Sequence, residues 1–422
     1  MMRKIIIFIA AFLTALIASA QSPWTLQQCV DTALANNRNI KQRELMRQNN
    51  ELAWQQARNN LLPNLNASAG QSWSFGRSQM VDGTYQNINS NSSNFSISSG
   101  ITLFDGLKMK YEIDSKMAQL KLSEANLQKI REDIVLSVSS AFLQVLLNKE
   151  LLQISNDQLK LTESRLEQQK SLVDAGKLAE GELFELYSQQ AKEELNRTQA
   201  ANTLKLSLLD LAQILELSDF EKLDITVSAD LVENELQLLS ADAVFASALK
   251  TRPEIKSAEL QLVNSEKNIQ IAKSFYFPTL SFGANVGGGY YNQVSTPLST
   301  SLGFNLSVPI FNKFQVKNQV RSAQIDVKSN QLNVENAKLE LRKTVQQAYF
   351  NAVAAKAKWD ASVKSVTSST EAYRFANQKY EGGRANVYEL YQAKNNLARA
   401  QSEVAQSKYE YVFRLKILEL LK

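Results

Sequence analysis

The chain has 422 residues, of which 44% are hydrophobic, 21% charged and 8% aromatic, a composition typical of a folded protein and not of a disordered one. It contains no histidine and a single cysteine, which excludes histidine-based catalysis, zinc clusters and an intrachain disulfide. The formal net charge is +5, and so small a surplus, spread along the chain, gives no reason to expect a nucleic-acid partner.

Residues 1–20 have the pattern of an export signal. Two basic residues precede an apolar run from Ile5 to Ile17, and Ala18-Ser19-Ala20 is a small-x-small cleavage site. The alternative is an uncleaved membrane anchor, but the run is shorter than the ~20 residues that span a bilayer. We expect export, with a mature chain that begins at Gln21. No long uncharged apolar run follows, so the mature chain is either soluble in an outer compartment or inserted as β-strands.

The remaining sequence contains an internal repeat. Ala57-Arg58, Pro63 and Leu65 match Ala272-Lys273, Pro278 and Leu280 at constant spacing, and the glycines fall into clusters separated by long segments without glycine or proline. Each half is expected to contain a helix, a strand pair, a very long helix, a tight turn and a returning helix. The predicted halves are residues 21–239 and 240–422, with strand pairs at about 64–104 and 279–311 and tips at 174–182 and 381–389.

Heptad spacing predicts the long helices. The helix expected at 107–175 carries apolar residues at every seventh position from Val138 to Val173, and the returning helix does so from Leu390 to Leu418. Small residues beside this seam, such as Ala400, allow close approach of a second helix. The pattern is also compatible with an ordinary soluble coiled coil.

Helix lengths suggest how the helices stack. The returning helix at 180–217 is too short to match the descending one, so we expect it to stack end to end with the opening helix of the other half, at 240–277. By the same argument the second returning helix, at 387–421, would stack on the opening helix at 25–62. The two stacks and the two long helices would then form four helical columns. The acidic segment at 218–239 would then form a collar.

The predicted strands alternate apolar residues with small polar ones. One face of the sheet is therefore apolar, and we expect the following residues on it to face lipid: Phe95, Ile97, Ile101, Leu103, Leu302, Phe304, Leu306 and Val308. A sheet packed on a soluble core is the alternative, but the neighbouring helices are committed to heptad seams and none remains to cover the sheet.

Four strands cannot close a barrel, and lipid does not tolerate an open sheet edge. Several chains must then share one barrel. Two chains would give eight strands and a filled interior, whereas three would give twelve strands and a lumen above a helical tube. Because a tube under a plugged barrel has no outlet, we expect three.

Several motifs resemble the TolC-like outer membrane efflux protein family over essentially the whole mature chain. They are the doubled Ala57-Arg58…Leu61-Leu62-Pro63-Asn64-Leu65 motif, the strand exits Leu103-Phe104-Asp105-Gly106 and Val308-Pro309-Ile310-Phe311-Asn312, and the tips around Gly176 and Gly383. The resemblance implies an α+β channel-tunnel in the cell outer membrane: a homotrimer with a shared twelve-stranded barrel and a coiled-coil periplasmic tunnel. It also implies a periplasmic adaptor protein and an inner-membrane pump of RND or ABC type as partners.

The resemblance further implies a gate near the periplasmic tips. Tyr380 and Glu389 match a gate tyrosine and acid, and Glu182 matches the acid of the first tip. The best-known family member has a second acid where this chain has Gln392 and an arginine where it has Ala385, with Arg384 displaced by one. Glu182 and Glu389 are equally compatible with ordinary acids in the first turn of a helix. The residues expected to dock the adaptor are Gly176, Lys177, Leu178, Gly383, Arg384 and Ala385.

The leading functional hypothesis is a passive export duct for efflux or type I secretion. A coiled-coil structural or adhesive surface protein and an exported enzyme are the alternatives, but the sequence contains no Gly-x-Ser-x-Gly elbow, phosphate loop or metal-ligand cluster. We therefore expect no catalytic, cofactor or metal site. Cys29 is expected to be a small buried apolar residue.

Overall fold

The chain divides into two compact units, and each takes segments from both halves of the sequence. A computed structural model describes residues 23–79, 83–87, 89–177, 180–221, 223–226, 240–291 and 294–422. The helical unit contains residues up to Lys41, Lys129–Arg252 and Glu340–Lys422, and the sheet unit contains Gln42–Gln128 and Pro253–Leu339. The expected export signal at 1–20, and residues 222 and 227–239 of the expected collar, lie outside the described residues.

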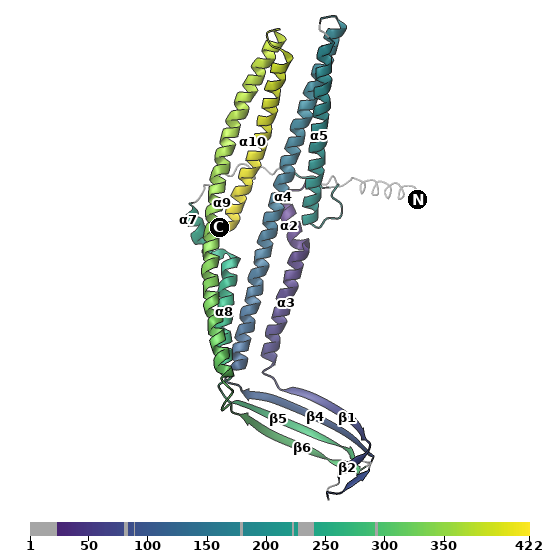
Figure 1. Cartoon of the computed structure of the whole chain (residues 1–422), viewed down its shortest axis with the longest axis vertical. Coiled ribbons are helices and arrows are strands. Elements are labelled where there is room, and N and C mark those ends of the chain that lie inside the picture. Colours follow the sequence, from purple (N-terminus) through teal and green to yellow (C-terminus); the bar gives the residue numbers. More distant parts are fainter. Residues whose placement is uncertain are drawn as a thin grey trace, which may run out of the picture. The chain divides into compact units, whose positions relative to one another are not determined.

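Helices and strands alternate along the chain in two similar series (Figure 1). In order they are α2 (Leu26–Asn36), α3 (Arg38–Asn59), β1 (Asn64–Ser74), β2 (Arg77–Gln79), β3 (Tyr85–Asn87), β4 (Ser90–Phe104), α4 (Lys108–Asp174), α5 (Gly181–Ile214), α7 (Ala241–Thr251), α8 (Pro253–Ser274), β5 (Thr279–Tyr291), β6 (Val294–Ser307), α9 (Gln315–Glu381) and α10 (Val387–Leu421). None of the helices in the described part of the chain is apolar enough over a sufficient length to cross a lipid bilayer.

The opening helix of each half begins where the sequence predicts. Thr25 caps α2 in a capping box with Gln28, and the Ser240 side chain accepts a hydrogen bond from the Ala243 N–H at the start of α7. The prediction of one continuous helix in each half is wrong, however. The chain breaks at Asn37 between α2 and α3 and at Arg252 between α7 and α8.

Local chemistry explains both breaks. The Asn37 Oδ1 accepts hydrogen bonds from the N–H groups of Asn39 (2.9 Å) and Ile40 (3.4 Å), so its side chain caps the start of α3 while its own backbone is extended. In the second half, Pro253 forces Arg252 out of the helical region and is itself accepted in the first turn of α8.

Heptad residues form the core of the helical unit. Val138, Val145 and Leu159 of α4 are buried, as are Leu390 and Leu397 of α10, which confirms these positions of the predicted seam. Val345 and Ala352 of α9 are fully buried at the matching positions in the second long helix. Apolar burial of this kind is the main source of stability in the unit.

The predicted stacking of the short helices is wrong. The end of α5 lies beside the start of α3, where Glu216 forms an ion pair of 2.9 Å with Arg38. The end of α10 lies beside α7, where the Arg252 Nη1 donates to the Leu420 carbonyl at 3.0 Å. Each returning helix therefore meets the opening helix of its own half. Helix length alone does not show which helices are neighbours, whereas these polar contacts do.

The sheet unit contains one four-stranded antiparallel sheet in the order β1-β4-β5-β6 (Figure 1). Its register places the predicted apolar residues opposite one another: Ile97 pairs with Ala67 on one side and Val286 on the other, and Phe282 pairs with Phe304. The two phenylalanine rings lie 5.0 Å apart. Since side chains alternate between faces, these residues share one face of the sheet.

Two details at the strand ends differ from the prediction. A bulge after Thr102 shifts the pairing by one residue, so Phe104 and not Leu103 is paired with Leu280. In the second half β6 ends at Ser307, so Val308 lies outside the strand in which the sequence placed it. Pro309 explains this early end, because proline provides no N–H for a ladder hydrogen bond. A short hairpin, β2 with β3, was not predicted and pairs Arg77 with Asn87.

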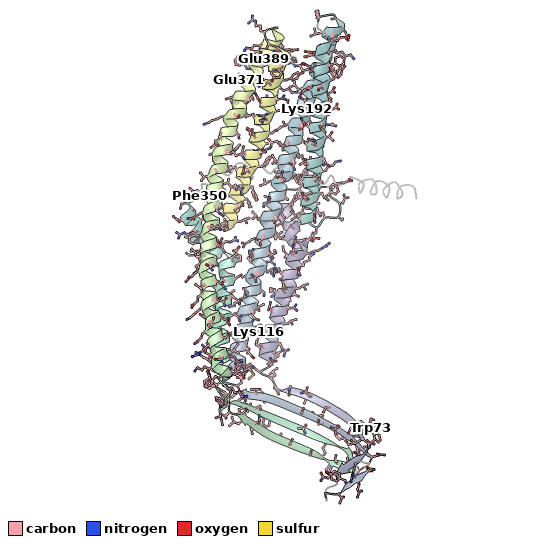
Figure 2. All side chains as sticks on the ribbon, viewed as in Figure 1. Trp73, Lys116, Lys192, Phe350, Glu371 and Glu389 are labelled. Carbon is pink, nitrogen blue, oxygen red and sulfur yellow. The ribbon has the colours of Figure 1, made fainter. Side chains whose placement is uncertain are left out.

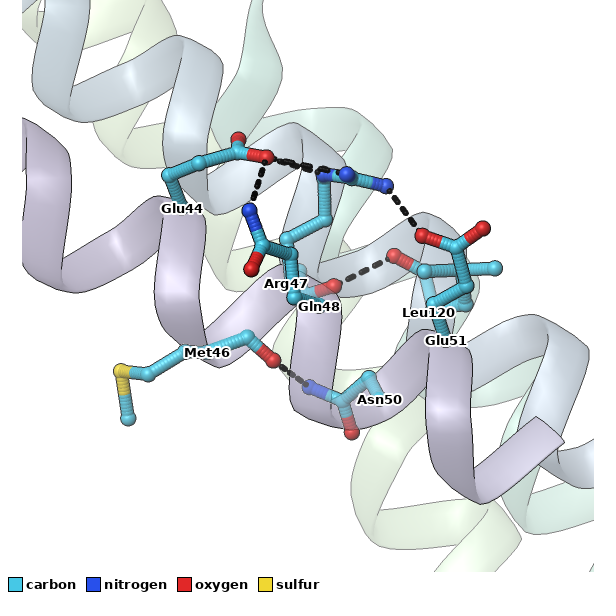
Figure 3. Close-up of polar contacts among 8 residues, drawn as sticks. Glu44, Met46, Arg47, Gln48, Asn50, Glu51 and Leu120 are labelled. Carbon is cyan, nitrogen blue, oxygen red and sulfur yellow. Dashed lines mark hydrogen bonds and ion pairs between the residues drawn. The ribbon is translucent and has the colours of Figure 1, made fainter. Parts of the chain in front are cut away.

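Helix α3 has few buried residues and is held in part by polar contacts along its own surface (Figure 3). Arg47 forms ion pairs with Glu44 (2.9 Å) and Glu51 (3.1 Å), one turn before it and one turn after it. Both carboxylates raise the pKa of the Arg47 guanidinium. Solvent screens such surface pairs, so they support the helix without fixing its place.

Gly106 makes the close approach between β4, α4 and the end of α8 possible. It has a φ of 70°, and a Cβ at this position would lie 2.7 Å from the Ser274 carbonyl oxygen and 2.8 Å from the Phe277 Cβ. Both the backbone conformation and the space therefore require glycine. This explains the glycine of the predicted Leu103-Phe104-Asp105-Gly106 strand exit.

Candidate functional sites at the helical tips and the polar face of the sheet

Two helical hairpins of the helical unit, α4 with α5 and α9 with α10, end in similar turns (Figure 1). Gly176 and Gly383 have φ angles of 69° and 64°, as the prediction that they are turn residues requires. Each is followed by a residue whose N–H bonds the carbonyl five positions earlier, Lys177 to Leu172 at 2.9 Å and Arg384 to Lys379 at 2.8 Å. Both hairpins therefore end in a Schellman turn.

Side chains of α4 and α9 connect the two hairpins close to these turns. The Gln169 Nε2 donates a hydrogen bond to the Tyr380 hydroxyl, and Arg165 contacts Asn377 and forms an ion pair of 3.5 Å with Glu381. Gln169 is buried, and its Oε1 has no hydrogen-bond donor among the described residues. An unpaired buried carbonyl costs about 1 to 3 kcal/mol. The contact between the two hairpins at Gln169 is therefore weaker than one in which every polar atom is hydrogen-bonded.

The structure brings one of the predicted gate residues, Tyr380, into this contact and leaves others at the surface. Glu389 is exposed near the end of the second hairpin, and its backbone N–H is capped by the Asn386 Oδ1 at 2.9 Å (Figure 2). Gln392 and Arg384 are exposed as well. Glu182 lies in the first turn of α5, where the sequence places it. The Glu182 side chain and the predicted docking residue Leu178 lie outside the described residues.

Farther from the turns, a buried ion pair joins α10 to the first hairpin. The Lys394 Nζ lies 2.8 Å from the Glu193 Oε1, and the two side chains are 4% and 6% exposed. Lys394 also donates to the Thr162 hydroxyl and to the Gln158 carbonyl at 3.1 Å, and Thr162 donates to the second Glu193 oxygen at 2.6 Å. Burial lowers the pKa of Lys394 below its usual 10.5, while the hydrogen bond to Glu193 opposes that shift.

The heptad analysis did not find this cluster. Lys394 and Glu193 occur beside the seam on helices where charged residues are common, and a charged residue on a heptad helix usually lies on a solvated face. Only three-dimensional packing shows that the two are paired. Gln169 and Arg165 were missed for the same reason, because their partners lie more than two hundred residues away.

The polar face of the sheet forms a second candidate site. A hollow of about 1150 Å³ lies over the strands. Its lining includes hydroxyl and amide residues such as Asn64, Ser98, Asn285 and Asn305, together with apolar residues such as Ile101 and Phe282, and none of the lining residues is charged. Serine pairs bridge neighbouring strands on this face, with the Ser68 and Ser96 oxygens 2.8 Å apart. Residues of the apolar face outside this hollow are largely exposed, with Ile97 at 53% and Leu306 at 62%.

The described residues contain no group of three or more acidic, cysteine or histidine side chains that could hold a metal ion. Cys29 is fully buried and unpaired, and burial raises its pKa to about 12. It is thus a core residue, as predicted.

Comparison with known proteins identifies one family. The sequence model of the outer membrane efflux proteins matches residues 29–216 and 244–421. OpmQ, a pyoverdine export outer membrane protein of Pseudomonas aeruginosa, is 28% identical over 284 residues, which cover 60% of this chain and 54% of OpmQ. Outer membrane protein TolC of Escherichia coli K12 is 22% identical over 373 residues, covering 85% of this chain and 73% of TolC.

A solved structure has the same fold. The Campylobacter jejuni CmeC outer membrane channel superposes with a TM-score of 0.81 at 17% identity, covering 94% of this chain and 85% of CmeC. The matched part of this chain spans between 37% and 64% of the length of three curated relatives, which include OpmQ.

Proposed function

Because the chain belongs to the outer membrane efflux protein family, we propose that it is the outer-membrane channel of a tripartite efflux or type I secretion system. In this role it is a passive duct, and the energy for transport comes from an inner-membrane pump. The relatives include a toxin and drug export protein and a pyoverdine export protein, which supports export over the alternative of an adhesive coiled-coil protein.

One structural observation carries the proposal: the sheet has one apolar and one polar face, and its large apolar residues, such as Ile97 and Leu306, are exposed and not covered by a core. A sheet on a soluble core has the opposite arrangement, since its apolar face is covered. An apolar outer band with a polar interior is the arrangement of a strand that separates lipid from a water-filled lumen. Lipid is therefore the environment that best fits the exposed Phe95, Ile97, Leu302, Phe304 and Leu306.

We propose a trimer with a shared twelve-stranded barrel. Within the described chain β1 and β6 are the edges of the four-stranded sheet, and each pairs on one side only. Edges in lipid must be paired, which β1 of one copy and β6 of the next would do. Exposed leucines and isoleucines on helices of the sheet unit support further contacts between copies. They recur at heptad spacing: Leu45 and Leu52 on α3, and Ile325, Leu332 and Leu339 on α9.

We propose that the hairpin tips form the closed periplasmic end and the adaptor contact. The hydrogen bond between Gln169 and Tyr380 and the contacts of Arg165 support this assignment, because they hold the two hairpins together next to the turns. Glu389, Gln392 and Glu182 would face neighbouring copies there, and the residues around Gly176 and Gly383 would meet a periplasmic adaptor. The two separate segments matched by the family model, together with two long helices of 67 residues each, support an internal duplication.

Purification from the outer-membrane fraction tests the proposal. We expect native mass spectrometry in detergent to give three copies per particle, and planar-bilayer recording to give a small resting conductance that increases when the tip contacts are removed. A monodisperse monomer that stays soluble after cleavage at Ala20 would rule out the channel. A stable trimer without any conductance would favour the structural alternative.

A further inference from the structure

The four strands of the main sheet carry no charged side chain. Strands β1, β4, β5 and β6 together contain no aspartate, glutamate, lysine or arginine, although these residues make up 21% of the whole chain. Contact with lipid would explain the absence of charge on the apolar face only, because lipid excludes charge from that face. On the polar face, where water would tolerate charge, serine, threonine, asparagine and glycine predominate.

The hollow on the polar face shows the same property. None of the residues that line it is charged, including Gln56, Asn59 and Asn60 at the end of α3. Charged residues return just beyond the strands. Arg77 follows β1 and lies 5.4 Å from the Tyr85 ring, and Asp105 follows β4 and accepts a hydrogen bond from the Met109 N–H at 3.0 Å. Along the strands themselves the polar face is electrically neutral.

We propose that the barrel part of the duct does not sort cargo by charge, and that it passes cationic, anionic and uncharged polar compounds alike. This inference rests on the proposed channel function and describes the chemistry of its lumen. Selection by charge, where the protein has any, would then belong to the helical part, whose tips carry Arg384, Glu389 and Lys177.

The physical reason lies in how pores select ions. A ring of carboxylates attracts cations and repels anions, and a ring of basic groups does the reverse, because the field of fixed charges extends over about 8 Å at physiological salt. A hydroxyl group donates one hydrogen bond and accepts others, and an amide does both as well. Such groups can turn toward an ion of either sign, so they stabilise both to a similar degree and favour neither.

Opposite charges placed at one lumen position test the proposal. Asn305 lies on the polar face of β6, opposite Ser281, and lines the hollow. The full-length channel and its Asn305→Asp, Asn305→Lys and Asn305→Gln variants are compared in planar bilayers by their reversal potential in a KCl gradient. Ser98→Asp and Ser98→Lys on β4 provide a second pair, in case a substitution at Asn305 impairs assembly.

From a neutral starting point we expect Asp and Lys to shift the reversal potential by similar amounts in opposite directions, and Gln to leave it unchanged. The helical part is the same in all variants, so a difference between the Asp and Lys variants reports the charge placed in the barrel. If Asp changes nothing while Lys removes an existing cation preference, or the reverse, a fixed charge already acts in the barrel and the inference is wrong. If the unmodified chain forms no conducting oligomer at all, the proposed function itself fails, which is a different result.

Discussion

The helical unit and the sheet both repeat apolar residues regularly, at heptad spacing in the helices and at every second position in the strands, with opposite results for burial. In the helical unit apolar residues such as Val138 are fully buried, and Lys394 is buried only together with Glu193. In the sheet, Leu306 is mostly exposed and the residues that line the hollow are all uncharged. A charged side chain is therefore tolerated inside the helical unit when it is paired, whereas the sheet has no charged side chain on either face. The difference fits helices that are packed against each other in water and strands that separate lipid from a lumen.

Removing one member of the buried ion pair should have the largest effect. Lys394→Ala leaves Glu193 and the Thr162 hydroxyl buried without their cation, and loss of one partner of a buried pair typically costs about 3 to 5 kcal/mol. We expect the free energy of unfolding to fall by that amount in denaturant titrations followed by circular dichroism.

Replacing both members separates pairing from packing. In Lys394→Met combined with Glu193→Leu no buried charge remains, and replacement of a buried pair by apolar residues is often neutral or stabilising. We therefore expect the double variant to recover most of the stability. If Lys394→Ala is as stable as the unmodified chain, the pair does not hold the hairpins together.

Lysine scanning of the two sheet faces should have the next largest effect. Lysine in place of Ile97, Ile101, Phe304 or Leu306 would place a cation on the proposed lipid face, at a cost of about 2 to 4 kcal/mol near the bilayer centre. Lysine in place of Ser98 or Asn305 would enter the hollow and remain hydrated. We expect the first set to reduce the amount of heat-labile oligomer in the outer membrane more than the second. Equal loss in both sets would mean that the faces or the register have been assigned wrongly.

Alanine at the tips should change conductance more than stability. Combined replacement of Tyr380, Glu389 and Glu182 removes the phenol that accepts from Gln169 and two first-turn carboxylates, while the buried heptad residues are unchanged. We expect a higher single-channel conductance with the trimer intact. Tyr380→Phe alone is the matched control for the hydroxyl and should give part of the increase. Unchanged conductance in the triple variant would place the constriction elsewhere and leave Glu182 and Glu389 as ordinary first-turn acids.

Patterns with a strong local period could be predicted from the sequence. The long helices begin and end within a few residues of the predicted bounds, the opening helices start at the predicted positions with caps at Thr25 and Ser240, and the strands alternate as expected. Each of these features depends on neighbours in sequence, such as a capping side chain, a heptad or a two-residue alternation.

Features that depend on competing local hydrogen bonds, or on partners far away in the sequence, could not be predicted. The sequence around Asn37 is compatible with an uninterrupted helix, and the break comes with hydrogen bonds that the Asn37 side-chain oxygen accepts from the next backbone N–H groups. Pro253 was a visible signal for the second break, because a proline restricts the residue before it. The contacts of Lys394 and Gln169 join residues far apart in the chain, and no periodicity reports them.

The smallest expected effect concerns Cys29, which tests burial in the helical unit without disturbing charge pairs. Burial raises the pKa of the thiol from 9.0 to about 12, so between these pH values the folded chain keeps a proton that the unfolded chain loses. The stability contributed by this group is thus complete below pH 9 and decreases as the pH rises toward 12.

Cys29→Val removes the titration and matches the buried Val244 at the start of the second half. We expect the unfolding midpoint of the valine variant to rise relative to that of the unmodified chain as the pH increases over that range. We also expect alkylation of the Cys29 thiol in the folded protein at pH 8 to be slow unless denaturant is added. Rapid alkylation of the folded protein would show that the Cys29 thiol is accessible and that this part of the helical core opens readily.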